Sequence, residues 1–303
     1  MRIAVTGAGG QVVSALREMG TRQGHEIVPL ARPDFDLAHA ETAGAVLDAV
    51  RPDVLVSAAA FTAVDLAESQ REEAFRVNGE GPGVLARETA RLGIPMLHLS
   101  TDYVFDGSKP VPYVETDLTG PRSVYGASKL EGERAVAAGN PRQVVLRTAW
   151  VYSHEGKNFL RTILRLAEGN PVVRVVSDQF GCPTYAPDIA GVLLAIADRV
   201  KGAGAGSAEF GLFHMTAAGD TSWAGFAEAI FDQARRVGAR AARVVSIATS
   251  DYPTPAARPG NSRLACGKLE DVYGLRLPHW HSGVERCVSR IARDTEPLRR
   301  TEP

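Results

Sequence analysis

Strand-length apolar runs alternate with helix-length segments through the first half of this 303-residue chain. The apolar runs occupy residues 2–6, 25–30, 53–58, 95–100 and 143–148. They are continuous, which is typical of parallel strands that helices cover on both faces. The intervening segments, 12–19, 41–50, 80–92 and 123–138, are long enough to be crossover helices. The pattern therefore predicts an α/β protein with a doubly wound parallel sheet.

The pattern loosens after residue 150, where shorter strand candidates stand among helical stretches. The helical stretches are 158–168, 187–200 and 221–237, and the strand candidates are 172–176, 212–216 and 243–246. Residues 201–207 and the proline-rich 251–260 are typical of loops. We expect a dinucleotide-binding domain over 1–150 and a smaller C-terminal α/β substrate lobe over 151–303. Some segments of the lobe are expected to return to the first domain.

Composition and charge narrow the classes of function. The 34 basic and 35 acidic residues leave a formal charge of −1, which gives the chain no overall attraction for nucleic acid or membranes. Cys182, Cys266 and Cys287 are too few and too scattered for a disulfide framework or a zinc site. We see no signal-peptide core and no apolar stretch of membrane-spanning length. We expect a cytoplasmic protein.

A glycine-rich turn, TGAGGQVV at residues 6–13, follows the first predicted strand and opens the first predicted helix. Gly7 and Gly10 permit a tight turn and let backbone N–H groups approach a pyrophosphate at the helix N-terminus. Val13 stands where a third glycine is usual, so we expect the helix to stand slightly off the strand. The turn indicates a Rossmann-type nucleotide site, although an ordinary loop between strand and helix remains the alternative.

Charged residues after the second strand bear on the choice of cofactor. Arg32 would pair with the 2′-phosphate of NADPH, whereas an acidic residue such as Asp34 or Asp36 would accept the 2′-hydroxyl of NADH. The alternative is that these are solvated loop charges. We favour NADPH over NADH.

Tyr125 and Lys129 are four residues apart on a predicted helix, so their side chains share one face. A nearby ammonium stabilises a phenolate, and we expect Lys129 to lower the pKa of Tyr125 toward neutrality. Thr101 ends the fourth strand, at the sheet edge where open α/β sheets bind ligands. Its hydroxyl could share a substrate oxygen with Tyr125. A surface contact between cation and phenol is the alternative for the pair, and a backbone-bonded hydroxyl is the alternative for Thr101.

These motifs, in this order, resemble those of the dTDP-4-dehydrorhamnose reductase family of extended short-chain dehydrogenases/reductases. The likeness covers nearly the whole chain. The matching segments are residues 6–13, 58–69, 77–86, 100–107, 125–133, 146–152, 178–184, 221–223 and 258–264. STDYVFDG and DQFGCPT are the most specific of them. The resemblance implies reduction of the C4 keto group of dTDP-4-dehydro-L-rhamnose by NADPH or NADH, the last step of dTDP-L-rhamnose synthesis.

The resemblance also implies roles for individual residues. Tyr125 would donate the proton, Lys129 would assist from the nicotinamide ribose, and Thr101 would be the third catalytic hydroxyl. The cofactor site would comprise Gly7, Gly10, Gln11, Val12, Arg32, Asp36, Leu37, Ala60, Phe61, Thr62, Asn78, Tyr125 and Lys129. The substrate site would comprise Val64, Thr101, Asp102, Tyr103, Trp150, Gln179, Arg258 and Asn261. Structural roles remain the alternative for Trp150, Gln179 and Arg258.

Other members of the wider fold class remain as rivals. Related dehydratases carry an Asp-Glu pair after the threonine, whereas this chain has Asp102 and Tyr103. A reductase of another nucleotide-linked 4-keto-6-deoxy sugar would keep these residues. So could a non-catalytic NADP-binding subunit like the regulatory subunit of methionine adenosyltransferase. Relatives with a magnesium-bridged dimer carry acidic residues where this chain has Ala15 and Pro187. We therefore expect no metal site, and a monomer or weak homodimer.

Overall fold

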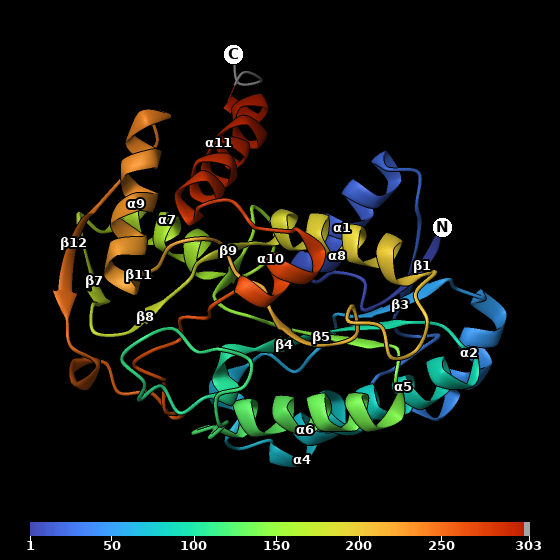
Figure 1. The fold of residues 1–303 in the computed structure, drawn as a ribbon. Helices are drawn as coiled ribbons and strands as arrows, with labels where there is room; N and C mark the ends of the chain where they lie inside the picture. Colours follow the sequence, from blue (N-terminus) through green and yellow to red (C-terminus); the bar gives the residue numbers. More distant parts are fainter. Residues whose placement is uncertain (300–303) are drawn as a thin grey trace.

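A central parallel sheet organises the protein. The computed structural model describes the backbone of residues 1–299 and the side chains of residues 1–294. The strands lie in the order β10-β5-β4-β3-β1-β2 (Figure 1). They are β1 (Arg2–Thr6), β2 (Glu26–Leu30), β3 (Val54–Ser57), β4 (Met96–Thr101), β5 (Gln143–Thr148) and β10 (Gly211–His214). The doubly wound α/β prediction is confirmed. The winding reverses between β1 and β3, the place where such sheets bind ligands outside their carboxyl ends.

Two layers of helices cover the sheet, one on each face (Figure 1). One layer contains α1 (Gln11–Arg22), α8 (Ala186–Val200) and α10 (Gly267–Tyr273). The other contains α2 (Ala43–Val50), α5 (Gly81–Arg91) and α6 (Val124–Gly139). Each layer encloses its own apolar core, which explains the continuous apolar strands. Both α8 and β10 come from beyond residue 150 and complete the sheet domain.

Short helices join the sheet to these layers. They are η1 (Ala40–Thr42), α3 (Val64–Ala67), α4 (Arg71–Phe75), the π-helical η2 (Arg76–Glu80), η3 (Asp102–Val104) and η4 (Thr249–Asp251). The segment formed by α3, α4 and η2 leads from β3 into α5. The predicted helix 41–50 begins within η1, and the predicted helix 80–92 begins at the last residue of η2. The elements α3, α4, η3 and η4 were not predicted, because segments of three to five residues are too short to show a helical pattern.

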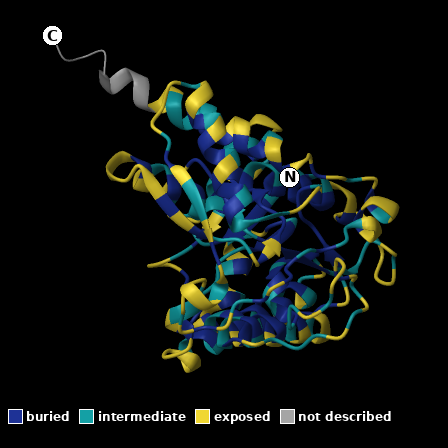
Figure 2. Ribbon diagram, turned by 90° about the vertical axis from the view of Figure 1, so that its left-hand side faces the viewer, coloured by how far each residue is buried: buried dark blue, intermediate teal, exposed yellow. Residues whose placement is uncertain are grey.

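The remaining elements form a second, smaller layered unit beside the sheet (Figure 1). Its helices are α7 (Phe159–Gly169), α9 (Trp223–Arg236) and α11 (Trp280–Arg299). Its paired strands are β7 (Val172–Val176) with β12 (Arg243–Ile247), β6 (Val151–Tyr152) with β9 (Thr184–Tyr185), and β8 (Phe180–Gly181) with β11 (Thr221–Ser222). A separate apolar core lies between α7, α9, α11 and β7. Figure 2 shows the buried residues gathered inside both units and the exposed ones on loops and outer helix faces. Within residues 1–299, no helix combines the length and apolar character needed to cross a membrane.

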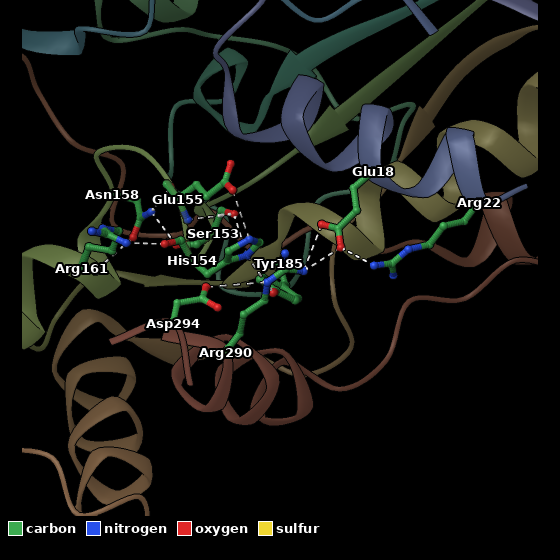
Figure 3. Close-up of polar contacts among 10 residues, drawn as sticks. All are labelled: Glu18, Arg22, Ser153, His154, Glu155, Asn158, Arg161, Tyr185, Arg290 and Asp294. Carbon is green, nitrogen blue, oxygen red and sulfur yellow. Dashed lines mark hydrogen bonds and ion pairs between the residues drawn. The ribbon is translucent and has the colours of Figure 1, made fainter. Parts of the chain in front are cut away.

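Polar contacts hold the smaller unit against α1 and α8. Arg290 on α11 donates to both carboxylate oxygens of Glu18 on α1, at 2.9 and 3.0 Å (Figure 3). Arg286 donates to both oxygens of Asp188 at 2.8 and 2.6 Å. Asn158, which caps α7, also donates to Oε1 of Gln11 at 2.9 Å. The lobe is therefore tied directly to the first turn of α1, beside the glycine-rich turn.

Candidate functional site

The glycine-rich turn has the geometry that a pyrophosphate requires. Gly7 has φ +91°, a left-handed conformation that favours glycine. Gly10 is the N-cap of α1, and no side chain of the described residues caps that turn. The first N–H groups of a twelve-residue helix are therefore available to an anion. The arrangement fits the diphosphate of a dinucleotide.

Val13, which was expected to hold α1 slightly off β1, belongs to the apolar core. Its side chain is 2% exposed and packs in the layer beneath α8. The turn is braced on its other side by Thr6, whose hydroxyl accepts hydrogen bonds from the N–H groups of Ala58 and Ala59, each at 2.9 Å. This links the turn after β1 to the segment after β3.

Asn78 fixes the segment that was predicted to run along the ribose and nicotinamide. Its Oδ1 accepts from the N–H of Phe61 at 2.8 Å, and its Nδ2 donates to the Phe61 carbonyl at 3.1 Å. Nδ2 also donates to Oγ of Ser128 on α6 at 2.9 Å. Asn78 is fully buried. One amide thus sets the position of Ala60, Phe61 and Thr62 relative to α6.

The residues predicted at the adenosine end follow β2. Asp36 accepts from the N–H of Ala38 at 3.0 Å, so one of its oxygens serves the local turn. Leu37 is buried, with its carbonyl close against Gly81 of α5. Arg32 is exposed at the start of this loop. The loop thus presents a guanidinium and a carboxylate at the end of β2.

The structure brings Thr101, Tyr103 and Tyr125 together. Ser123 caps α6 by accepting from the N–H of Gly126 at 3.1 Å, which places Tyr125 in the first turn. A Cβ on Gly126 would lie 2.2 Å from the carbonyl oxygen of Tyr103, so only glycine allows this approach. The rings of Tyr103 and Tyr125 meet edge to face, with centroids 5.6 Å apart. Thr101, at the end of β4, lies close enough to Tyr125 to act on the pKa of its hydroxyl.

The pKa of Tyr125 moves in the direction opposite to the prediction. Burial raises it to about 12, while the hydrogen bond with Thr101 acts to lower it. The prediction that Lys129 lowers this pKa was therefore wrong for the protein without ligands, because loss of hydration around a phenolate outweighs favourable contacts. With this raised pKa the phenol of Tyr125 keeps its proton at neutral pH, as a proton donor must.

Lys129 is held by two buried acceptors. Its Nζ donates to the Leu99 carbonyl at 2.7 Å and lies 3.4 Å from Nε2 of His98. Burial lowers the pKa of Lys129 to about 8, with Glu133 acting to raise it. Burial, followed by the charge of Lys129, also lowers the pKa of His98, whose Nδ1 lies 3.1 Å from Oγ of Ser57. A neutral His98 fits an acceptor role toward Lys129. The sequence analysis missed His98 because it sits among apolar residues of β4.

Asp102 is a buried carboxyl group at the same site. It is 3% exposed and accepts from the Thr101 hydroxyl at 3.0 Å. Burial raises its pKa to about 6, against the lowering effects of Ser262 and Thr101. Around pH 6 the Asp102 carboxyl group is therefore present in both its protonated and its ionised form, whereas an ordinary aspartate is almost fully ionised there.

Asp102 should make stability depend on pH. Between roughly pH 4 and pH 6 the folded protein retains a proton that the unfolded chain has released, so the free energy of unfolding falls as pH rises through that window. We expect Asp102→Asn to remove a dependence on the order of 3 kcal/mol. Urea unfolding at pH 4, 5, 6 and 7 measures it. Equal pH dependence in the two proteins would contradict the prediction.

Two stacked tryptophans form one wall on the lobe side. Trp150 follows β5 with φ +48°, a conformation rarely adopted by non-glycine residues and found at functional sites. Its ring stacks on Trp223 of α9 with centroids 3.5 Å apart. A Cβ on Gly181 would lie 2.4 Å from the Trp150 ring, so glycine makes room for it. The sequence analysis named the segment with Trp223 but gave that side chain no role.

Three polar residues of the lobe were predicted to bind substrate, and they differ in what they contact. Gln179 donates to the Thr249 hydroxyl at 3.0 Å. Asn261 donates to the carbonyls of Lys109 and Val111 at 2.6 and 2.9 Å, which commits its amide nitrogen to the loops. Arg258 pairs with Asp65 at 2.8 Å, and its Nη1 is buried without a hydrogen-bond partner in the described part of the chain. Arg258 therefore has a buried donor that no described residue uses.

Val64, the other residue predicted to touch substrate, begins α3 and is half-buried. Ala15 is buried in α1, and Pro187 lies in the first turn of α8. Among the described residues, no group of three or more His, Cys, Asp or Glu side chains could hold a metal ion.

The parallel sheet, the glycine turn and the Tyr125–Lys129 pair define a Rossmann-type protein of the short-chain dehydrogenase/reductase class. Residues 1–293 match the family described as the RmlD substrate binding domain. A dTDP-4-dehydrorhamnose reductase of Sinorhizobium fredii is 50% identical over 288 residues, which cover 95% of this chain and 97% of that protein. The chain belongs to the dTDP-4-dehydrorhamnose reductase family, as its motifs had indicated.

Solved structures agree with this assignment. The dTDP-4-dehydrorhamnose reductase of Clostridium acetobutylicum has a TM-score of 0.89 at 34% identity, covering 96% of this chain and 99% of that one. The enzyme of Bacillus anthracis, solved in complex with NADP, has a TM-score of 0.88 at 31% identity, covering 95% and 99%.

Proposed function

We propose that this protein reduces the C4 keto group of dTDP-4-dehydro-L-rhamnose to give dTDP-L-rhamnose, the last step of dTDP-rhamnose synthesis. One observation carries the proposal: a protonated Tyr125 stands beside Thr101 at the carboxyl edge of the sheet, with Lys129 one turn behind. The family membership gives the substrate its identity, because the relatives that match over nearly the whole chain bear this reductase's name.

In this mechanism Tyr125 donates its phenolic proton to the oxygen that develops negative charge at C4. Thr101 hydrogen-bonds the same oxygen and orients it. Lys129, anchored by Leu99 and His98, would hold the nicotinamide ribose and would stabilise the phenolate that Tyr125 leaves behind. Asp102 and Tyr103 contact the sugar, Trp150 forms its aromatic wall, and preorganised donors of this kind act mainly through orientation.

The cofactor that fits the chain is NADPH, with NADH as the alternative, and it supplies a hydride when bound. The uncapped first turn of α1, with Gly7, Gly10, Gln11 and Val12, would hold the pyrophosphate. Asp36 and Leu37 would border the adenosine, and residues 60–62 would follow the ribose and nicotinamide. The complex of the Bacillus anthracis enzyme with NADP supports this choice.

The assay that tests the function follows oxidation of NADPH and of NADH with dTDP-4-dehydrorhamnose made in the same vessel by upstream enzymes. We expect oxidation with NADPH and formation of dTDP-rhamnose, identified by mass spectrometry. Oxidation with a different nucleotide-linked 4-keto-6-deoxy sugar alone would reassign the substrate. No oxidation, with NADPH still bound, would favour the regulatory-subunit alternative.

Arg32→Ala tests how the cofactor is chosen. We expect KM for NADPH to rise about tenfold because a charge-assisted contact with the 2′-phosphate is lost. KM for NADH should change less than twofold, since NADH lacks that phosphate. Steady-state kinetics with both cofactors measure the difference, and a parallel rise in both KM values would refute the role of Arg32.

The division of labour between the two units is part of the proposal. Residues 1–150, completed by later segments, would bind the dinucleotide, and most of 151–303 would bind the sugar nucleotide. The chain would act as a monomer or weak homodimer, because Ala15 and Pro187 stand where metal-bridged relatives carry acidic side chains.

A further inference from the structure

A single carboxylate of α3 holds a loop of the smaller unit. Oδ1 of Asp65 accepts from the N–H of Ala256 at 3.2 Å, and Oδ2 accepts from Nη2 of Arg258 at 2.8 Å. These partners lie 191 and 193 residues further along the chain. Both oxygens are used, so one side chain fixes the backbone of the loop and the direction of its arginine.

The residue directly after α3 also holds the start of α6. Glu68, three residues after Asp65, accepts from the N–H of Val124 at 2.8 Å. Val124 is the first residue of α6 and precedes Tyr125. Positions i and i+3 lie on neighbouring parts of a helix surface. The end of α3 therefore contacts both the Arg258 loop and the helix that carries the proton donor.

The held arginine has an unused donor. Nη1 of Arg258 is buried and has no hydrogen-bond partner among the described residues, although its side chain is 20% exposed. A buried donor without a partner is costly. A planar guanidinium with one edge engaged and another free is well suited to receive a phosphate oxygen. Arg258 also lies close enough to Tyr103 to influence its pKa, which places it near the substrate pocket.

We propose that Asp65 is a positioning residue that orders the loop 254–258 and aims Nη1 of Arg258 at the diphosphate of the bound sugar nucleotide. This inference rests on the proposed function. It goes further in giving a role to a residue that touches neither cofactor nor substrate. The negative charge of Asp65 would by itself repel a diphosphate, so its role is geometric, and the two effects predict opposite results when the charge is removed.

The test is Asp65→Asn, compared with Glu68→Gln as a matched loss of one charge at the end of the same helix. Asparagine keeps one acceptor oxygen, so in either orientation of its amide the NH₂ group faces one of the two donors, the guanidinium or the Ala256 N–H, and one of the two contacts that order the loop is lost. For Asp65→Asn we expect KM for the sugar nucleotide, and the Kd for dTDP measured by calorimetry, to rise about tenfold. The kcat and the Kd for NADPH should stay within twofold. Glu68→Gln should leave the Kd for dTDP unchanged.

A double-mutant cycle identifies the route of the effect. In an Arg258→Ala background, Asp65→Asn should add less than twofold to the Kd for dTDP if Asp65 acts through Arg258. An undiminished effect in that background, unchanged dTDP binding in the single variant, or tighter binding would each overturn the inference. Thermal unfolding checks the fold of the single variant. A Tm within 2 degrees of the parent corresponds to a stability change below about 1 kcal/mol. If the parent binds dTDP but reduces no 4-keto sugar, the proposed function fails, and the positioning role is still tested by binding.

Discussion

Tyr125→Phe is expected to lower kcat by about 10²–10³, because phenylalanine removes the one proton donor aimed at the developing alkoxide. The ring is kept, so its edge-to-face contact with Tyr103 should survive. Binding of NADPH should therefore change less than twofold. Single-turnover measurements of NADPH oxidation, with fluorescence titration of the cofactor, determine both quantities.

Two comparisons sharpen the Tyr125 prediction. In the protein without ligands, burial raises the pKa of Tyr125 to about 12 and lowers the pKa of Lys129 to about 8. The parent should therefore lose activity above about pH 8, where Lys129 loses its charge, before Tyr125 loses its proton. Thr101→Val keeps the shape of the side chain but removes its hydroxyl, and should cost less than Tyr125→Phe. If Tyr125→Phe reduced the substrate at the parental rate, the proton donor would have to be another group.

Arg147→Met is expected to lower the free energy of unfolding by about 3–5 kcal/mol, the usual cost of breaking a buried ion pair from one side. Arg147 on β5 donates to both carboxylate oxygens of Glu133 on α6, at 2.8 and 2.7 Å. Their side chains are 3% and 8% exposed, so the remaining carboxylate would have little access to water. Urea unfolding at pH 7 measures the loss.

The matched control is the double variant Glu133→Gln, Arg147→Met. It removes both charges of this pair, and Ser100, which donates to Glu133 at 2.5 Å, can still bond to the glutamine. We expect it to recover more than half of the lost stability. A single variant within 1 kcal/mol of the parent, or a double variant less stable than the single one, would contradict this account. Because Glu133 follows Lys129 by one turn of α6, the pair also anchors the catalytic helix.

Much of the sheet was predictable because its signal is local. The apolar runs at 2–6 and 143–148 coincide with β1 and β5, and the others differ from β2, β3 and β4 by one or two residues. The strands after residue 150 were harder to assign to a sheet. The strand candidate at 212–216 becomes β10, which pairs with β5 and extends the main sheet. No periodicity distinguishes a strand that joins this sheet from one that forms a new one.

The candidate site divides in the same way. Tyr125 and Lys129 are neighbours because of helical geometry, and Gly7 and Gly10 follow from the turn between strand and helix. His98 acquires its position only because β4 packs beneath α6. Likewise, Trp150 stacks on Trp223, and Asp65 meets Arg258, across long stretches of chain. The raised pKa of Tyr125 also depended on burial, which spacing alone does not reveal.

By itself, the sequence determined the doubly wound class, the glycine turn and the spacing of the proton donor and its lysine, because each depends on hydrogen bonds or periodicities within a few residues. Only the tertiary structure decided which distant groups meet: Asp65 with Arg258, His98 with Lys129, and the lobe with α1. Burial and long-range contact depend on how whole elements pack, and those contacts set the protonation and direction of the groups that perform the chemistry.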